Sequence, residues 1–170
     1  QPTVDNELAD ACGLDDPFRS AAQAARALQL GKVTAEELLA MQIARIIDYN
    51  PALNAIVTLD LEHARERARQ ADSARARGEC WGPLHGVPIT IKDSFETAGL
   101  RTVSGYPPFR NHVPGQDAPP VARLRAAGAI ILGKTNLPTL ANGIQTNNPV
   151  FGLNALGGAQ SPLLAALSLA

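Results

Sequence analysis

The sequence predicts an α/β protein in which a helical front segment leads into a layer of parallel strands. Residues 18–80 hold three stretches whose apolar side chains recur at helical spacing. Residues 87–93 and 129–133 are short apolar runs rich in β-branched residues, and a helical stretch separates them. A strand, a helix and a second strand in succession indicate parallel strands that are covered on both faces.

Three helices are expected in the front segment. Residues 18–30 are rich in alanine and are followed by a glycine, which is typical of a helix with a C-terminal cap. The second helix begins at Thr34, because Glu37 stands three residues later and completes a capping box. We expect this helix to end near Pro51 and a third helix to cover about 59–77. The arginines of the third helix alternate with acidic residues, which is typical of a solvated helix face.

The composition is that of a soluble globular protein with one domain of ordinary size. Of its 170 residues, 45% are hydrophobic and 18% are charged. The net charge of −1 excludes an electrostatic attraction to nucleic acid or to an anionic membrane, and no apolar run reaches membrane-spanning length. Cys12 and Cys80 have no second Cys or His at metal-ligand spacing, so we expect neither a metal nor another cofactor. The chain begins at Gln1 and not at Met, and we expect a cytoplasmic protein that has lost its first residues.

Residues 128–135 match the pattern of a phosphate loop, in which Gly, four residues and Gly-Lys-Thr follow one another. In such a loop the four intervening residues curl around a phosphate group. Here they are Ala-Ile-Ile-Leu, which favour a buried strand. We therefore expect no nucleotide site, and we expect Lys134 to anchor a loop through hydrogen bonds.

Lys92 is the main candidate for chemistry. Side chains alternate across a strand, so Ile89 and Ile91 share one face while Lys92 lies on the other. If both faces are covered, the ammonium group is shielded from water, and burial favours its uncharged form. A neutral lysine at the carboxyl end of a strand is a suitable general base. The alternative is a charged, structural lysine that pairs with Asp93 or Glu96.

Other nucleophiles and bases are weaker candidates. His63, His85 and His112 are expected on an exposed helix, in a tight turn and in a loop, without a partner at metal-ligand spacing. No serine stands in a nucleophile-elbow context, which disfavours a Ser-His-Asp triad. Residues 142–152 are polar and rich in turns, as in a segment that lines a ligand site. Ser161 precedes a proline and an apolar run, so it begins either an ordinary capped helix or one whose free amides hold an oxyanion.

Several longer segments stand together in a specific order. They are GPLHGVPITIKDSFETAGLRTVSG, DAPPVARLRAAGAIILGKTNLPTLANG and TNNPVFG, preceded by TAEELL and NPALNAIV. Together they resemble the N-terminal half of the amidase signature family over about 18–152. The resemblance implies a mixed, mostly parallel sheet covered by helices, of which this chain supplies only the N-terminal part. Residues 1–170 are then a single incomplete domain, with an irregular arm (1–17), a helical front (18–80) and the start of the α/β core (81–170).

The resemblance also implies a Ser–cis-Ser–Lys site. The lysine of the family's Lys-Asp block matches Lys92, which would take a proton through a bridging serine. A second serine would attack the amide carbonyl and form an acyl-enzyme, which water then hydrolyses. Ala141 matches a position whose main chain contacts substrate in relatives.

The likeness ends after residue 152. Gly157 and Gly158 match part of a substrate-binding glycine segment, but Ala159 and Gln160 stand where two serines belong. If the match to the family pattern is shifted by two residues, Ser161 falls at the position of the bridging serine. The nucleophilic serine is expected beyond Ala170.

The function expected from this resemblance is hydrolysis of a linear carboxylic amide, without a cofactor. Two alternatives stay open: the glutaminase subunit of a tRNA-dependent amidotransferase, and a non-catalytic binding module that has lost its serines. The expected partner is a small-molecule amide. A homodimer stays open as well.

Overall fold

The computed structural model describes residues 20–155 of the chain. The main elements follow one another in the order α2 (Ala21–Gln29), α3 (Ala35–Leu53), β1 (Ile56–Leu59), α4 (Leu61–Ala76), β2 (Pro88–Lys92), α5 (Pro119–Ala126) and β3 (Ile130–Thr135). Single 3-10 turns lie at Pro107–Phe109 and Thr139–Ala141, and a short antiparallel pair joins β4 (Asn147–Asn148) to β5 (Gly152–Leu153). The predicted succession of helices and strands is confirmed, except that the sequence analysis did not predict β1.

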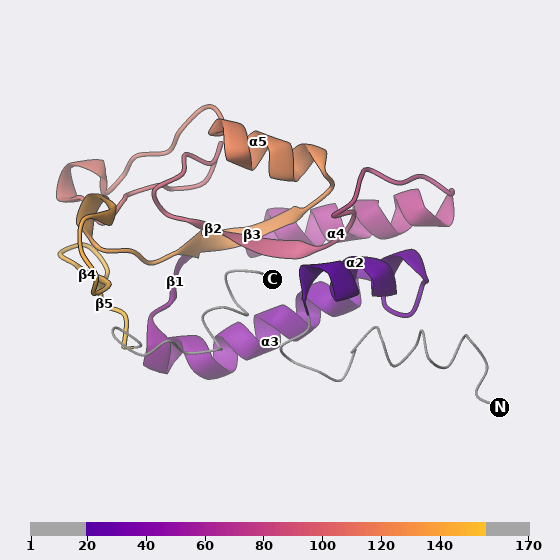
Figure 1. Cartoon of the computed structure of the whole chain (residues 1–170), viewed down its shortest axis with the longest axis horizontal. Coiled ribbons are helices and arrows are strands. Elements are labelled where there is room, and N and C mark those ends of the chain that lie inside the picture. The colour runs from indigo at the N-terminus through magenta and orange to yellow at the C-terminus, as the bar shows by residue number, and fades with distance from the viewer. Residues whose placement is uncertain (1–19, 156–170) are drawn as a thin grey trace.

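The three longer strands form one mixed sheet in the order β1-β3-β2, with β3 in the centre. β2 and β3 run parallel, as predicted, because α5 carries the chain back between them. β1 runs antiparallel to β3, which the sequence did not indicate. Figure 1 shows α2 and α3 on one side of this sheet and α5 on the other, as in a layered α/β protein.

The predicted start of α3 is confirmed. Thr34 Oγ1 accepts a hydrogen bond of 3.1 Å from Glu37 N, and Glu37 Oε2 accepts one of 2.9 Å from Thr34 N. Asp72 of α4 adds two more bonds, because its carboxylate accepts from the N–H groups of Ala35 (2.8 Å) and Glu36 (3.1 Å). A negative charge at a helix N-terminus is favourable, so Asp72 holds α4 against the start of α3.

α3 ends close to the predicted position near Asn50–Pro51. The proline lies within the last turn, and α3 continues to Leu53. Asn54 then adopts a left-handed conformation with φ of 52°. The side chain of Asn50 accepts hydrogen bonds of 2.9 and 2.8 Å from the next two N–H groups of the chain. These bonds satisfy the helix end and direct the chain into β1.

The core is built from alanine and aliphatic side chains. The helical spacing of Leu61, Ala64, Ala68 and Ala71 on α4 predicts a narrow apolar stripe, in which the three alanines are buried and Leu61 is partly buried. The opposite face carries exposed arginines, for example Arg69 beside Glu66, so its interpretation as a solvated face is confirmed there. Arg67 differs, since its guanidinium group lies 3.6 Å from the centre of the Trp81 ring. Within residues 20–155, no helix is both long enough and apolar enough to cross a membrane.

Candidate active site

Two lysines lie at the carboxyl ends of the two parallel strands, and their environments are opposite. Lys92 ends β2 and is exposed, whereas Lys134 lies in β3 with a fully buried side chain. In the register of the two strands, Ile91 lies opposite Lys134, and Lys92 lies opposite Thr135. Residues in register point to the same face of a sheet. The two lysines therefore lie on opposite faces.

The expected burial of Lys92 is wrong for the described chain. Alternation along β2 is correct, since Ile89 and Ile91 are buried and Lys92 lies on the other face. That other face is well covered at the start of the strand: a Cβ atom at Gly86 would lie 3.1 Å from Ala35 Cβ of α3. This cover does not reach the strand end. Lys92, at that end, is exposed.

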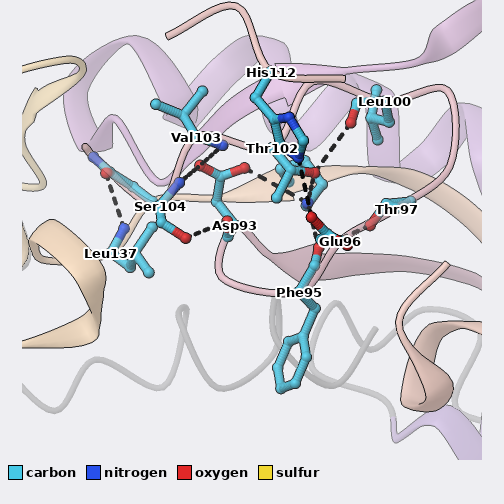
Figure 2. Close-up of polar contacts among 12 residues, drawn as sticks. Asp93, Phe95, Glu96, Thr97, Leu100, Thr102, Val103, Ser104, His112 and Leu137 are labelled. Carbon is cyan, nitrogen blue, oxygen red and sulfur yellow. Dashed lines mark hydrogen bonds and ion pairs between the residues drawn. The ribbon is translucent and has the colours of Figure 1, made fainter. Parts of the chain in front are cut away.

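The alternative interpretation, in which Lys92 is a structural lysine paired with Asp93 or Glu96, is also wrong for residues 20–155. Glu96 Oε1 lies 3.0 Å from His112 Nε2, so this carboxylate is used in another contact. Asp93 Oδ2 accepts hydrogen bonds from the backbone N–H groups of Val103 and Ser104 (Figure 2), and Asp93 Oδ1 lies 3.6 Å from Lys134 Nζ. Among residues 20–155, the Lys92 side chain has neither a hydrogen bond nor an ion pair.

Lys134 anchors the loop that follows β2, as predicted. Its Nζ atom donates hydrogen bonds of 2.7 Å to Phe95 O and 2.6 Å to Thr102 Oγ1, and it lies 3.6 Å from Asp93 Oδ1. Burial lowers the pKa of the Lys134 ammonium group to about 8, against the opposing effect of the Asp93 carboxylate. The segment 130–135 is an extended strand, so it does not curl around a phosphate group, and the exclusion of a phosphate loop agrees with the structure.

Asp93 is a functional candidate that sequence reasoning missed. Its side chain is fully buried, and its Oδ2 atom accepts from Val103 N (3.0 Å) and Ser104 N (2.9 Å). Burial raises the pKa of this carboxyl group, while Lys134 and the two backbone amides act in the opposite direction. The signal was available, because alternation places Asp93 on the buried face together with Ile91.

The loop that carries Ala141 lies next to this cluster. Ser104 O accepts a hydrogen bond of 2.8 Å from Leu140 N. Ser104, Leu140 and Ala141 all have φ between 53° and 58°, a left-handed conformation that is uncommon for residues other than glycine. Such conformations cluster at functional sites. The structure therefore brings the predicted position Ala141 to the same end of the sheet as Lys92.

Comparison with known proteins identifies the family. The family model described as Amidase matches residues 37–155. The chain belongs to the amidase family. It is 43% identical, over 128 residues, to a glutamyl-tRNA(Gln) amidotransferase subunit from Roseiflexus sp. (strain RS-1), and the match covers 75% of this chain and 26% of that protein. The corresponding protein from Acidothermus cellulolyticus is 39% identical over 134 residues, which cover 79% of this chain and 26% of that protein.

Solved structures of amidases have the same fold. The peptide amidase from Stenotrophomonas maltophilia matches with a TM-score of 0.74 and 31% identity, over 79% of this chain and 29% of that one. A 6-aminohexanoate cyclic dimer hydrolase matches with a TM-score of 0.72 and 30% identity, over 82% of this chain and 28% of that one. The predicted amidase-signature fold is thus confirmed. The chain spans about a quarter of the length of the amidotransferase subunits that it matches.

The histidines of this amidase-family chain have structural contacts. His63 Nδ1 lies 2.7 Å from Asp60 Oδ1 on the surface. His85 is buried and accepts from Trp81 N, while its Nε2 atom lies 3.0 Å from Ala71 O. In residues 20–155, His, Cys, Asp and Glu side chains form no group of three that could hold a metal ion. Three predicted site residues, Gly157, Gly158 and Ser161, lie outside the described residues.

Proposed function

We propose that the complete gene product hydrolyses a carboxylic amide and that Lys92 is its proton-transfer base. One observation carries this proposal. In a chain of the amidase family, Lys92 lies at the carboxyl end of a parallel strand, and the two carboxylates beside it in the sequence are used elsewhere. A strand-end lysine without a structural partner is available for chemistry.

The proposed reaction follows the Ser–cis-Ser–Lys route. Uncharged Lys92 takes a proton through a bridging serine, for which Ser161 is the candidate within this chain. A second serine, beyond Ala170, attacks the amide carbonyl and forms an acyl-enzyme, and water then releases the acid. The main chain at Ala141, Gly157 and Gly158 is proposed to bind the substrate.

A basic Lys92 requires that water be kept from its amine. A fully solvated lysine keeps its proton at neutral pH. Because Lys92 is exposed in the described residues 20–155, the proposed reaction requires that the complete gene product shields this amine from water.

The proposed substrate is a small, linear amide, and the proposed location is the cytoplasm. The names of the relatives suggest which amides to test first. The amidotransferase relatives make glutamine the first choice, assayed as ammonia release with and without charged tRNA. The similarity to a peptide amidase makes a C-terminal peptide amide the second substrate to test.

The experiment compares two exposed lysines in the complete gene product. Lys92→Ala removes the proposed base, and Lys32→Ala removes a lysine that lies between α2 and α3. Wild type and Lys32→Ala should react covalently with a fluorophosphonate or an activated ester. Lys92→Ala should react at least about 100-fold more slowly, in line with the loss of a general base.

Two results would contradict the proposal. Turnover by Lys92→Ala above a few per cent of wild type would exclude Lys92 as the base. A folded wild-type protein that neither reacts with the probe nor releases ammonia would favour a non-catalytic binding module.

A further inference from the structure

One carboxylate connects the strand that ends at Lys92 with two loops. Asp93 follows Lys92 directly, and its N–H donates a hydrogen bond of 3.1 Å to Thr135 O, so strand pairing continues past the lysine. The Oδ2 atom of Asp93 accepts from the N–H groups of Val103 and Ser104. Because Asp93 is the residue next to Lys92, the strand end that carries the amine can move little relative to the loop that Asp93 binds.

The second loop is attached to the first at the same turn. Ser104 O accepts a hydrogen bond of 2.8 Å from Leu140 N, and Gly105 O accepts one of 3.3 Å from Thr139 Oγ1. Leu140 precedes Ala141. An uninterrupted path of hydrogen bonds and covalent bonds therefore leads from Lys92 through Asp93 and Ser104 to the main chain of Ala141.

We infer that Asp93 is a positioning residue: its carboxylate, paired with Lys134, holds the loop that carries Ala141 in place relative to Lys92. This inference rests on the proposed function. It assigns to the buried ion pair a task beyond stability, because a proton-transfer base and a main-chain contact to substrate must stand at a fixed distance from one another.

The charge of Asp93 is needed for this task. Hydrogen bonds to an ionised acceptor are roughly twice as strong as neutral ones, so the charge strengthens both bonds that Asp93 Oδ2 accepts. Lys134 lies 3.6 Å from the second oxygen and supplies the opposite charge in a site without water contact. Lys134 also bonds to Phe95 O and Thr102 Oγ1, so it holds the first loop from its other side.

The chain offers a matched control for Asp93. Asp72 also accepts from two consecutive N–H groups, those of Ala35 and Glu36. Ala35 lies beside Gly86, at the start of β2, so Asp72 is separated from Lys92 by the length of a strand, roughly 20 Å. Asp93→Asn and Asp72→Asn thus make the same chemical change at opposite ends of β2.

The experiment measures amide hydrogen exchange and kinetics on the complete gene product. In Asp93→Asn, exchange at Ser104 and also at Leu140 and Ala141 should become about tenfold faster or more. The kcat/KM for an amide substrate should fall about 100-fold, as expected when reacting groups are misplaced. In Asp72→Asn, faster exchange should be confined to Ala35 and Glu36, and kcat/KM should stay near that of wild type.

A second variant tests the same contact without disturbing the buried charges. Thr139→Val removes the hydrogen bond to Gly105 O and leaves Asp93 and Lys134 intact. Exchange at Leu140 should increase, and KM should rise while kcat is kept, because Lys92 itself is not displaced. Such a split between KM and kcat is not expected from a general loss of stability.

The outcomes separate the two proposals. Unchanged exchange at Leu140 in Asp93→Asn, or equal losses of kcat/KM in Asp93→Asn and Asp72→Asn, would overturn the positioning role. If wild type has no turnover at all, the proposed function fails, and the exchange data alone still decide whether Asp93 holds the loop of Ala141.

Discussion

The ammonium nitrogen of Lys134 lies 3.6 Å from a carboxylate oxygen of Asp93, and neither side chain has any exposed surface. Burial alone disfavours the charged form of each group, since it lowers the pKa of the lysine and raises that of the aspartate. Each charge in turn favours the ionised form of the other. The pair is therefore stable only as a unit, which makes it sensitive to the loss of either member.

The first prediction concerns this mutual dependence. Lys134→Met should lower the free energy of unfolding by about 3–5 kcal/mol, because it leaves a buried carboxylate without its opposite charge. Asp93→Asn should have an effect of the same sign. The double variant should be more stable than the sum of the single effects predicts, because it removes both charges together. Urea unfolding of the four proteins measures the interaction energy, and simple additivity would show that the two charges do not depend on one another.

The second prediction concerns alkaline pH. In the unfolded chain Lys134 takes up its proton with a pKa near 10.5, whereas burial lowers its pKa to about 8 in the folded protein. Between these values the unfolded state holds more protons, so a rise in pH stabilises the folded state. The free energy of unfolding of wild type, minus that of Lys134→Met, should therefore increase between pH 8 and 10.5, by about 3 kcal/mol in total. A difference that stays constant or decreases over this range would contradict the lowered pKa.

The two lysines show what sequence reasoning could and could not predict. Alternation along β2 placed Lys92 on the opposite face from Ile91, and the structure agrees. Whether that face is covered depends on how far α3 and its neighbours extend over the strand, which is a long-range property. The burial expected for Lys92 was therefore wrong, while Lys134, expected only to anchor a loop, is the lysine without exposed surface.

The missed strand β1 has a similar explanation. Residues 56–59 are too few for a clear alternation, and an irregularity in the pairing with β3 interrupts the register between Ile56 and Thr58. What defines this strand is its partner, since Asp60 N donates to Leu132 O at its end. The helices were easier to predict because their caps are local: Thr34 and Glu37 are three residues apart and bond to each other.

The third prediction separates catalysis from stability. Lys92→Met should lower the free energy of unfolding by far less than Lys134→Met does, because within residues 20–155 the Lys92 side chain has no hydrogen bond or ion pair to lose. Thermal or urea unfolding beside Lys134→Met provides the comparison, since the same substitution is made at a buried site on the neighbouring strand. A large loss of stability in Lys92→Met would mean that the amine has a structural partner, and the argument for a free base would fail.

The fourth prediction concerns the turn that joins the two loops. Gly105 has φ of 59°, and a Cβ atom added there would lie 2.7 Å from Asn148 Cβ. The Asn148 side chain cannot move away easily, because it is buried and its amide donates to Asn136 Oδ1 and Leu137 O. Gly105→Ala should therefore destabilise the protein by about 1–2 kcal/mol for the left-handed backbone and by about 1–3 kcal/mol for overpacking.

Gly115→Ala is the matched control for this turn, because it meets no atom within 4 Å and its φ is not in the left-handed region. This variant should unfold like wild type in the same urea titration. Gly105→Ala should also lower kcat/KM, since the displaced turn carries both the Ser104 and the Thr139 contacts to the loop of Ala141. If Gly105→Ala proved as stable and as active as Gly115→Ala, the close packing of this turn against Asn148 would have no part in holding the two loops together.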